Sequence, residues 1–355
     1  MNERVQKIRE SIIEFGLDGI LIQNPVNRRY LSGFSGSAGV LYISKESSVL
    51  LTDFRYIEQA KKQAPNFKII NHTTHGFYKE INDLIKKENI NFLGFEAHTI
   101  SYKEYVEYTK SLTAAMKPTY HLIESLRMIK DETEISAIRQ AAHIADKAFS
   151  HILSYLRIGA VERDIALELE YFMKKNGASD LSFATIVASG AFSSIPHAVP
   201  TDKKLENGDF LVMDFGCIYK GYCCDMTRTV VIGKATDKHK EIYNTVLTAQ
   251  KLALEGIKPL KTGKEMDKIA REYIKSRGYG EYFGHGLGHC VGMEVHENPR
   301  LSINEEAKFY PGMIVTVEPG IYIPGFGGVR IEDLVVITED GIDNLTISHK
   351  ELIEI

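Results

Sequence analysis

Short apolar runs alternate with amphipathic stretches over the first third of the chain. The runs DGILIQ, GVLYIS, SVLLTD and NFLGFE have the length and composition of buried strands. The stretches FRYIEQAKKQA and FYKEINDLIKKE have apolar residues at helical spacing. This alternation predicts a small α/β domain over residues 1–125. The opening MNERVQKIRESIIEF predicts an amphipathic helix without an apolar h-region, so we expect no signal peptide.

The pattern changes after residue 125. The segment DETEISAIRQAAHIADKAFSHILSYL predicts a long amphipathic helix, with Asp131 as its N-cap and Glu134 three positions later. A second helix is predicted at VERDIALELEYFMKKNG, strands at SFATIVAS and DFLVMDFG, and helices at roughly 237–257 and 263–278. Strands and turns dominate the rest. Because this order does not repeat as βαβ, residues 126–355 are predicted to form an α+β domain on an antiparallel sheet.

Composition narrows the possible partners and the compartment. A length of 355 residues favours two domains, and a formal net charge of −4 without a basic patch argues against nucleic acid or an anionic membrane as the main partner. No run of 18 apolar residues occurs. The spacing of Cys217, Cys223, Cys224 and Cys290 matches neither a zinc ribbon nor a disulfide framework. We therefore expect buried, reduced thiols and a cytoplasmic protein.

One predicted hairpin, VMDFGCIYKGYCCDMTR, carries an aspartate near each end. If Tyr219 and Lys220 form its two-residue turn, Asp214 and Asp225 face each other directly on neighbouring strands. Two buried carboxylates in that position repel each other, and burying them unpaired costs several kcal/mol. The pattern therefore predicts a cation between them.

A second pair of acids occurs in VTVEPGIYIPGFGGVRIEDLVVIT. Glu318 and Glu332 are symmetric about Gly325 in the turn of another predicted hairpin. Between the two hairpins, YFGHGLGHCVGMEVHENP supplies His285, His289 and His296 in a glycine-rich setting. Carboxylates with imidazole are ligands that hold pairs of divalent cations.

Each of these residues also has a simpler interpretation. A single buried acid is more often a hydrogen-bonded or ion-paired group, and a single histidine is more often structural than a metal ligand. Four acids in two predicted hairpins, with a histidine cluster between them, favour a dinuclear metal site over these alternatives.

The segments VMDFGCIYKGYCCDMTRT, GHGLGHCVGMEVHENP, VTVEPGIYIP and GVRIEDLVVIT resemble the motifs of the pita-bread-fold metallopeptidases, which include methionine aminopeptidase, aminopeptidase P and prolidase. NRRYLSGFSGSAG and LLTDFRYIEQA resemble the N-terminal domain of aminopeptidase P and prolidase, so the resemblance spans essentially the whole chain. It implies a C-terminal pita-bread domain, a creatinase-like N-terminal domain and the compact bacterial and archaeal prolidase type, commonly a homodimer.

The resemblance also implies roles for individual residues. Asp214 would bind the first metal ion, Asp225 and Glu332 would bridge two ions, and His289 and Glu318 would complete the second. The substrate-side and supporting positions match His197, His285, His296, Tyr322 and Arg330. For His285 a purely structural role remains equally open.

A mechanism follows from such a site. Two divalent ions would supply a hydroxide from a shared water, with Glu318 shuttling its proton. His296 would stabilise the oxyanion, and His197 or Glu318 would protonate the leaving proline nitrogen. Mn²⁺ is the expected metal, with Co²⁺ or Zn²⁺ as alternatives.

The implied substrates are small peptides with an Xaa-Pro bond. Arg300 matches a prolidase position that can pair with a dipeptide carboxylate, which favours an Xaa-Pro dipeptidase over an Xaa-Pro aminopeptidase. A solvent-exposed loop arginine remains the alternative. A methionine-type aminopeptidase and a non-catalytic peptide-binding module on the same fold are less favoured, because the N-terminal domain and the complete ligand set argue against them.

Overall fold

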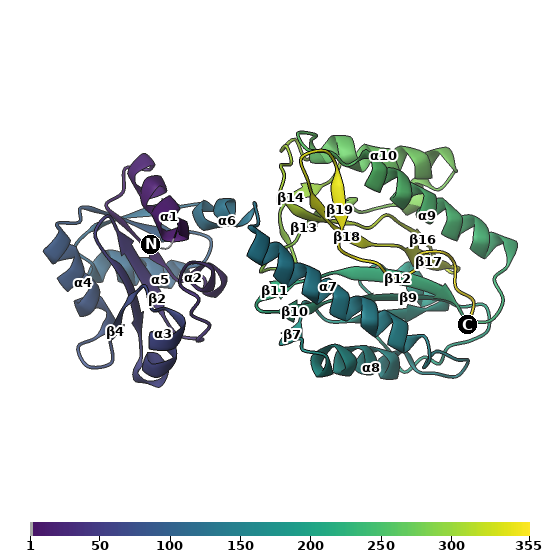
Figure 1. Ribbon diagram of the computed structural model, residues 1–355, viewed down its shortest axis with the longest axis horizontal. Coiled ribbons are helices and arrows are strands. Elements are labelled where there is room, and N and C mark those ends of the chain that lie inside the picture. The colour runs from purple at the N-terminus through teal and green to yellow at the C-terminus, as the bar shows by residue number, and fades with distance from the viewer. Residues whose placement is uncertain (1–2) are drawn as a thin grey trace. The chain divides into compact units, whose positions relative to one another are not determined.

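The computed structural model describes residues 3–355. It divides into two compact units, a first unit that ends at Arg127 and a second unit that runs from Met128 to Ile355 (Figure 1).

The first unit is built on a mixed six-stranded sheet in the order β4-β3-β2-β1-β5-β6. Three pairings are parallel: β3 with β4, β1 with β5, and β5 with β6. The pairings of β1 with β2 and of β2 with β3 are antiparallel. The strands are β1 Gly19–Ile22, β2 Val40–Ser44, β3 Ser48–Thr52, β4 Lys68–Asn71, β5 Phe92–Glu96 and β6 Ala115–Thr119. Sequence periodicity identifies the four buried strands but not the edge strands β4 and β6, because those two are largely half-buried or exposed.

Six α-helices accompany this sheet within the described part of the first unit: α1 Glu3–Glu14, α2 Pro25–Ser32, α3 Ile57–Gln63, α4 Phe77–Glu88, α5 Tyr102–Ser111 and α6 Leu122–Arg127. Their start signals are local: the Asn24 side chain caps α2, and Ser101 forms a capping box with Glu104 at the start of α5. The predicted N-terminal helix and the helices near residues 57 and 77 are present.

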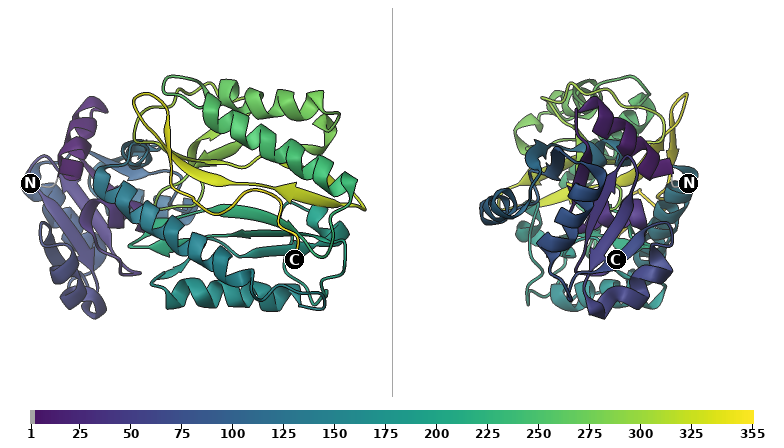
Figure 2. Two further views of the ribbon diagram at one scale, coloured as in Figure 1. Left: turned by 45° about the vertical axis from the view of Figure 1, so that its right-hand side comes forward. Right: turned by 90° about the vertical axis from the view of Figure 1, so that its left-hand side faces the viewer.

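The second unit carries four long helices, α7 Glu132–Ile152, α8 Glu162–Lys175, α9 Asp237–Gly256 and α10 Gly263–Ser276. The predicted capping box opens α7: Glu134 N donates to Asp131 Oδ1 at 2.9 Å, and Asp131 N donates to Glu134 Oε2 at 3.0 Å. The helices contact each other as two pairs, α7 with α8 and α9 with α10, and both pairings are visible in Figures 1 and 2.

Every strand pairing described in the second unit is antiparallel, apart from one isolated bridge near the C-terminus. The sheets are β12-β9-β8, β11-β10-β7, β14-β13-β15-β18-β19 and β16-β17. The strands are β7 Asp180–Leu181, β8 Ile186–Ser189, β9 Phe210–Phe215, β10 Cys217–Tyr219, β11 Tyr222–Cys223, β12 Met226–Val231, β13 Gly288–Cys290, β14 Glu297–Leu301, β15 Ile314–Val317, β16 Gly320–Ile323, β17 Gly327–Arg330, β18 Asp333–Ile337 and β19 Ile342–Asn344. The predicted α+β class is confirmed.

Two apolar clusters form the core of the second unit. One joins α7 and α8 to β9 and β12, and the other joins α9 and α10 to β13 and β15. The four cysteines are free and buried, as the sequence predicts. Among residues 3–355, no helix combines the length and the apolar character needed to cross a lipid bilayer.

Candidate metal centre and active site

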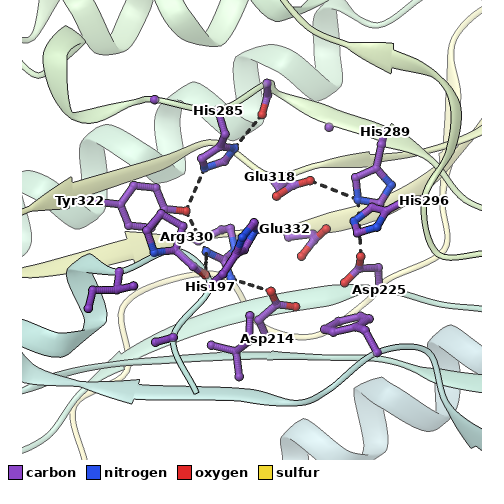
Figure 3. Close-up of a pocket in the computed structure, with 18 of the residues that line it drawn as sticks. His197, Asp214, Asp225, His285, His289, His296, Glu318, Tyr322, Arg330 and Glu332 are labelled. Atoms are coloured by element: carbon purple, nitrogen blue, oxygen red, sulfur yellow. Dashed lines mark hydrogen bonds and ion pairs between the residues drawn. The ribbon is translucent and has the colours of Figure 1, made fainter. Parts of the chain in front are cut away.

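A cavity of about 1140 Å³ in the second unit is lined by side chains from separate strands and loops (Figure 3). It brings together every residue that the sequence marks as a candidate site residue: His197, Asp214, Asp225, His285, His289, His296, Arg300, Glu318, Tyr322, Arg330 and Glu332.

Strand alternation places Asp214 in this cavity. Its neighbours Met213 and Phe215 point into an apolar cluster, so the Asp214 side chain between them points to the opposite face of β9. The predicted direct pairing of Asp214 with Asp225 is wrong, because Asp214 pairs with Thr227.

The turn residues explain this difference in register. The two-residue turn is Lys220 and Gly221, not Tyr219 and Lys220, and both turn residues have positive φ, 50° and 91°. A hairpin turn of this type needs φ > 0 at both positions, and glycine satisfies the second without strain. The shift moves Asp225 two residues along the strand from the position opposite Asp214, so it stays on the same face as a diagonal neighbour.

The second acid pair flanks the hairpin formed by β16 and β17. Gly320 pairs with Arg330 in this hairpin, and Val317 pairs with Asp333 between β15 and β18. Both pairings have the same register, which is centred on the predicted turn at Gly325. Glu318 and Glu332 lie between the two ladders, and their side chains face the acids of the first hairpin (Figure 3).

The carboxylates are buried so closely together that a fully ionised cluster needs a cation. Burial first, and then the charges of neighbouring acids, raise the pKa of Asp225 and of Glu332. Burial also raises the pKa of Glu318 to about 7. Oδ1 of Asp214 and Oδ1 of Asp225 are buried and have no hydrogen-bond partner. These unpaired oxygens are suited to metal ligation.

His289 supplies a nitrogen to the same space. Its Nδ1 lies 3.1 Å from the carbonyl oxygen of Cys290, which can only accept, so the ring proton is assigned to Nδ1. Burial lowers the pKa of His289 to about 4, so the ring is neutral at pH 7. The Nε2 lone pair then faces Asp225 Oδ2 at 3.7 Å and Glu318 Oε1 at 3.5 Å.

Facing lone pairs repel unless a proton or a metal cation lies between them. One ligand atom each from Asp225, His289 and Glu332 lies within 4.8 Å of the others, and all three residues are buried. The donor set therefore fits divalent metal ions, with Asp214 and Glu318 as the additional carboxylates at its edge.

Arg330 connects the acids to a second layer of side chains. Its Nη2 donates to Asp214 Oδ2 at 2.6 Å, its Nη1 donates to the Tyr322 hydroxyl at 2.8 Å, and its Nε donates to Thr227 Oγ1 at 2.9 Å. The Tyr322 hydroxyl lies 2.9 Å from His285 Nε2. His285 Nδ1 lies 2.8 Å from the Gly286 carbonyl, and burial lowers the pKa of His285 to about 4. Both ring nitrogens of His285 are therefore engaged.

Three predicted residues lie on the cavity wall outside the acid cluster. His197, His296 and Arg300 are exposed, and the structure of residues 3–355 gives none of their side chains a hydrogen bond or ion pair. The His296 ring packs edge-on against His289, with 4.5 Å between the ring centroids. These side chains are free to meet a bound molecule.

Two threonines that brace the acids are not among the residues predicted from the sequence. Thr227 Oγ1 donates to Glu332 Oε2 at 2.7 Å, and Thr316 Oγ1 donates to Glu318 Oε1 at 3.1 Å. Thr227 lies two residues after Asp225 and Thr316 lies two residues before Glu318, so each threonine points to the same face as a predicted metal ligand nearby in the sequence. That spacing is the signal from which both were identifiable.

The chain belongs to metallopeptidase family M24. The model of that family matches residues 136–339, and the model of the creatinase/prolidase N-terminal domain matches residues 4–129. The buried donor set described above is consistent with the divalent metals that this family binds.

Relatives with assigned activities cover the full length. The chain is 42% identical to the Xaa-Pro dipeptidase of Pyrococcus furiosus, over 99% of this chain and 100% of the relative. Among solved structures, it resembles an Xaa-Pro dipeptidase from Bacillus anthracis with a TM-score of 0.97 and 48% identity, covering 99% of both chains. It also resembles an X-Pro aminopeptidase from Thermotoga maritima with a TM-score of 0.93 and 37% identity, covering 99% of this chain and 100% of that one.

Proposed function

We propose that this metallopeptidase is an Xaa-Pro dipeptidase with two divalent ions in the cavity of the second unit. Asp214 would hold the first ion, Asp225 and Glu332 would lie between both, and His289 and Glu318 would complete the second. The unpaired Oδ1 atoms of Asp214 and Asp225 and the unprotonated Nε2 of His289 support this assignment. The dipeptidase activity of the Pyrococcus and Bacillus relatives supports the substrate class.

The bound ions would lower the pKa of a water molecule and polarise the scissile carbonyl. Glu318 would accept the proton of the attacking water, because its carboxylate lies at the cavity edge with Thr316 holding Oε1. His296 would donate to the developing oxyanion, and His197 would donate a proton to the departing proline nitrogen. Both imidazoles are exposed on the cavity wall without a hydrogen bond to the described residues.

Arg300 carries the choice of a dipeptide over a longer peptide. It lies on β14 at the cavity wall, and its guanidinium has no hydrogen bond or ion pair among residues 3–355. A guanidinium binds a carboxylate through two parallel hydrogen bonds, and the free carboxylate of an Xaa-Pro dipeptide presents that group close to the scissile bond. A longer peptide has an amide at this position.

The test compares kcat/KM for Leu-Pro and for Leu-Pro amide, which differ only at the C-terminal group. We expect the free acid to be preferred, and Arg300→Ala to lower kcat/KM for Leu-Pro about 10- to 100-fold with little effect on the amide. Arg157→Ala, at another exposed arginine of the second unit, is the matched control. Equal losses on both substrates would show that Arg300 does not recognise the carboxylate.

An Xaa-Pro aminopeptidase is the second candidate, because the chain also resembles the Thermotoga enzyme over its full length. We further propose Mn²⁺ as the working metal, since four of the five ligands are carboxylates, with Co²⁺ or Zn²⁺ able to compete. Small proline-containing peptides are the proposed substrates and a homodimer is the proposed assembly. Four buried, free thiols support a reducing, cytoplasmic compartment.

A further inference from the structure

Two histidines and a glutamate form a cluster at one edge of the sheet in the first unit. β5 and β6 are adjacent and parallel, and His98 and His121 each follow the carboxyl end of one of them. Glu124 lies in the first turn of α6. One ligand atom from each of the three residues lies within 4.8 Å of the others.

The contacts inside this cluster bring ligand atoms together. His98 Nε2 lies 3.0 Å from Glu124 Oε1. The rings of His98 and His121 stack with 4.9 Å between their centroids, which keeps the two imidazoles side by side. Both histidines are exposed, which leaves the cluster open to ions from solvent.

A hydrogen bond from a buried side chain orients the carboxylate of Glu124. Asn27, which is fully buried, donates from Nδ2 to Glu124 Oε1 at 2.6 Å. Asn27 is fixed in turn, because its Nδ2 also donates to Glu96 Oε1 at 2.7 Å and its Oδ1 accepts from Arg127 Nη1 at 2.7 Å. Ligating carboxylates in metal sites are commonly held by such an outer layer of hydrogen bonds.

A polar atom in the cluster has no partner. Glu124 Oε2 is buried and receives no hydrogen bond, although most buried oxygens in proteins receive one. His121 has a left-handed backbone with φ of 52°, a conformation that asparagine and glycine adopt more readily. Its carbonyl accepts hydrogen bonds from N and Oγ of Ser125, so the turn that presents the imidazole is fixed.

We propose that His98, His121 and Glu124 form a binding site for a transition-metal ion of the Zn²⁺ class. Two imidazoles and one carboxylate suit Zn²⁺, Ni²⁺ or Cu²⁺ and disfavour Mg²⁺ and Ca²⁺, which prefer oxygen ligands. Three protein ligands leave a fourth position open to solvent. The ion would tie the segments after β5 and β6 to α6 and so stabilise the first unit.

The first unit offers a matched control for this site. Exposed His75 Nδ1 lies 2.8 Å from Oε1 of the half-buried Glu80, so this pair has the same His–Glu chemistry. It is not part of any metal-competent group of three among residues 3–355. If the His98–Glu124 contact were only an ion pair like that of His75 with Glu80, neither site would bind a metal ion.

The experiment measures Zn²⁺ bound to the full-length, chelator-stripped protein by equilibrium dialysis and elemental analysis. The parent chain and the His75→Ala control are each expected to bind one more Zn²⁺ per chain than the double variant that combines His98→Ala and His121→Asn. Each single variant should bind this ion at least about tenfold more weakly. Asparagine is chosen at His121 because it tolerates positive φ.

Unfolding temperatures in chelator verify that each variant is folded before its metal content is compared. Equal Zn²⁺ stoichiometry and affinity in the parent, in His75→Ala and in the double variant would overturn the proposal. The readout does not depend on peptide hydrolysis, so it is separate from the test of the proposed function.

Discussion

Arg330 holds one oxygen of Asp214 and leaves the other free. Its Nη2 donates to Asp214 Oδ2 at 2.6 Å, while Asp214 Oδ1 is buried without a hydrogen-bond partner. The guanidinium also holds Tyr322 and Thr227, and Thr227 holds Glu332. The Arg330 guanidinium therefore orients two carboxylates of the proposed metal centre, Asp214 directly and Glu332 through Thr227.

Replacing Arg330 with lysine tests this bracing. An ammonium group cannot make the three directed contacts of the guanidinium, so Arg330→Lys should lower metal affinity about 10- to 100-fold and reduce kcat accordingly. Isothermal titration with Mn²⁺ measures the affinity. Unchanged metal affinity would show that Arg330 acts on substrate and not on the ligands.

Asp225→Asn should abolish hydrolysis and retain the fold. The raised pKa of Asp225, due to burial and the neighbouring acids, shows that its ionised form is disfavoured without a cation. An amide at this position relieves repulsion, so the metal-free variant should unfold at a higher temperature than the metal-free parent. Peptide hydrolysis tests the loss of activity, calorimetry tests the fold and the unfolding temperature, and metal analysis counts the bound ions. Two bound ions with parental turnover would contradict the ligand assignment.

The stability of the metal-free protein should respond to pH through Glu318. Burial raises its pKa to about 7, above the value of about 4.3 for an unfolded glutamate, so the folded state binds this proton more tightly. The contribution of Glu318 to stability is present at low pH and is lost as the pH rises from about 4.5 to about 7.

Glu318→Gln isolates that contribution. The variant should gain stability relative to the parent across this pH window, by up to about 3 kcal/mol at pH 7 without metal. His285 and His289 have lowered pKa values and change stability in the opposite direction, but they are present in both proteins. Urea unfolding in chelator at several pH values measures the difference. A difference that does not vary with pH would contradict the raised pKa.

A buried ion pair behind Glu332 should be important for stability. Arg228 Nη2 donates to Asp333 Oδ1 at 2.8 Å, and Arg228 Nη1 donates to the carbonyl of Glu332. Arg228→Met leaves part of a buried negative charge uncompensated, so it should cost about 3 kcal/mol of unfolding free energy. The exposed pair of Arg139 and Asp343 is the control, and Arg139→Met should cost less than about 1 kcal/mol. Similar losses of unfolding free energy in the two variants would contradict the larger contribution of the buried Arg228–Asp333 pair.

The sequence identified the features that depend on local pattern. Strand alternation and the two hairpins point to all four acids, and the capping box at Asp131 marks the start of α7. It did not give the register of the first hairpin, because the turn is decided by a lysine that adopts positive φ beside Gly221. Contacts such as Arg228 with Asp333 join residues 105 positions apart, and no local period encodes them.

The most direct test of the proposed activity compares hydrolysis of Leu-Pro and of Leu-Pro-Ala by the Mn²⁺-loaded protein under identical conditions. Faster cleavage of the dipeptide is the predicted result, because in the proposed binding mode only the dipeptide would present a carboxylate to Arg300. Faster cleavage of the tripeptide would contradict the dipeptidase assignment and make the protein an Xaa-Pro aminopeptidase.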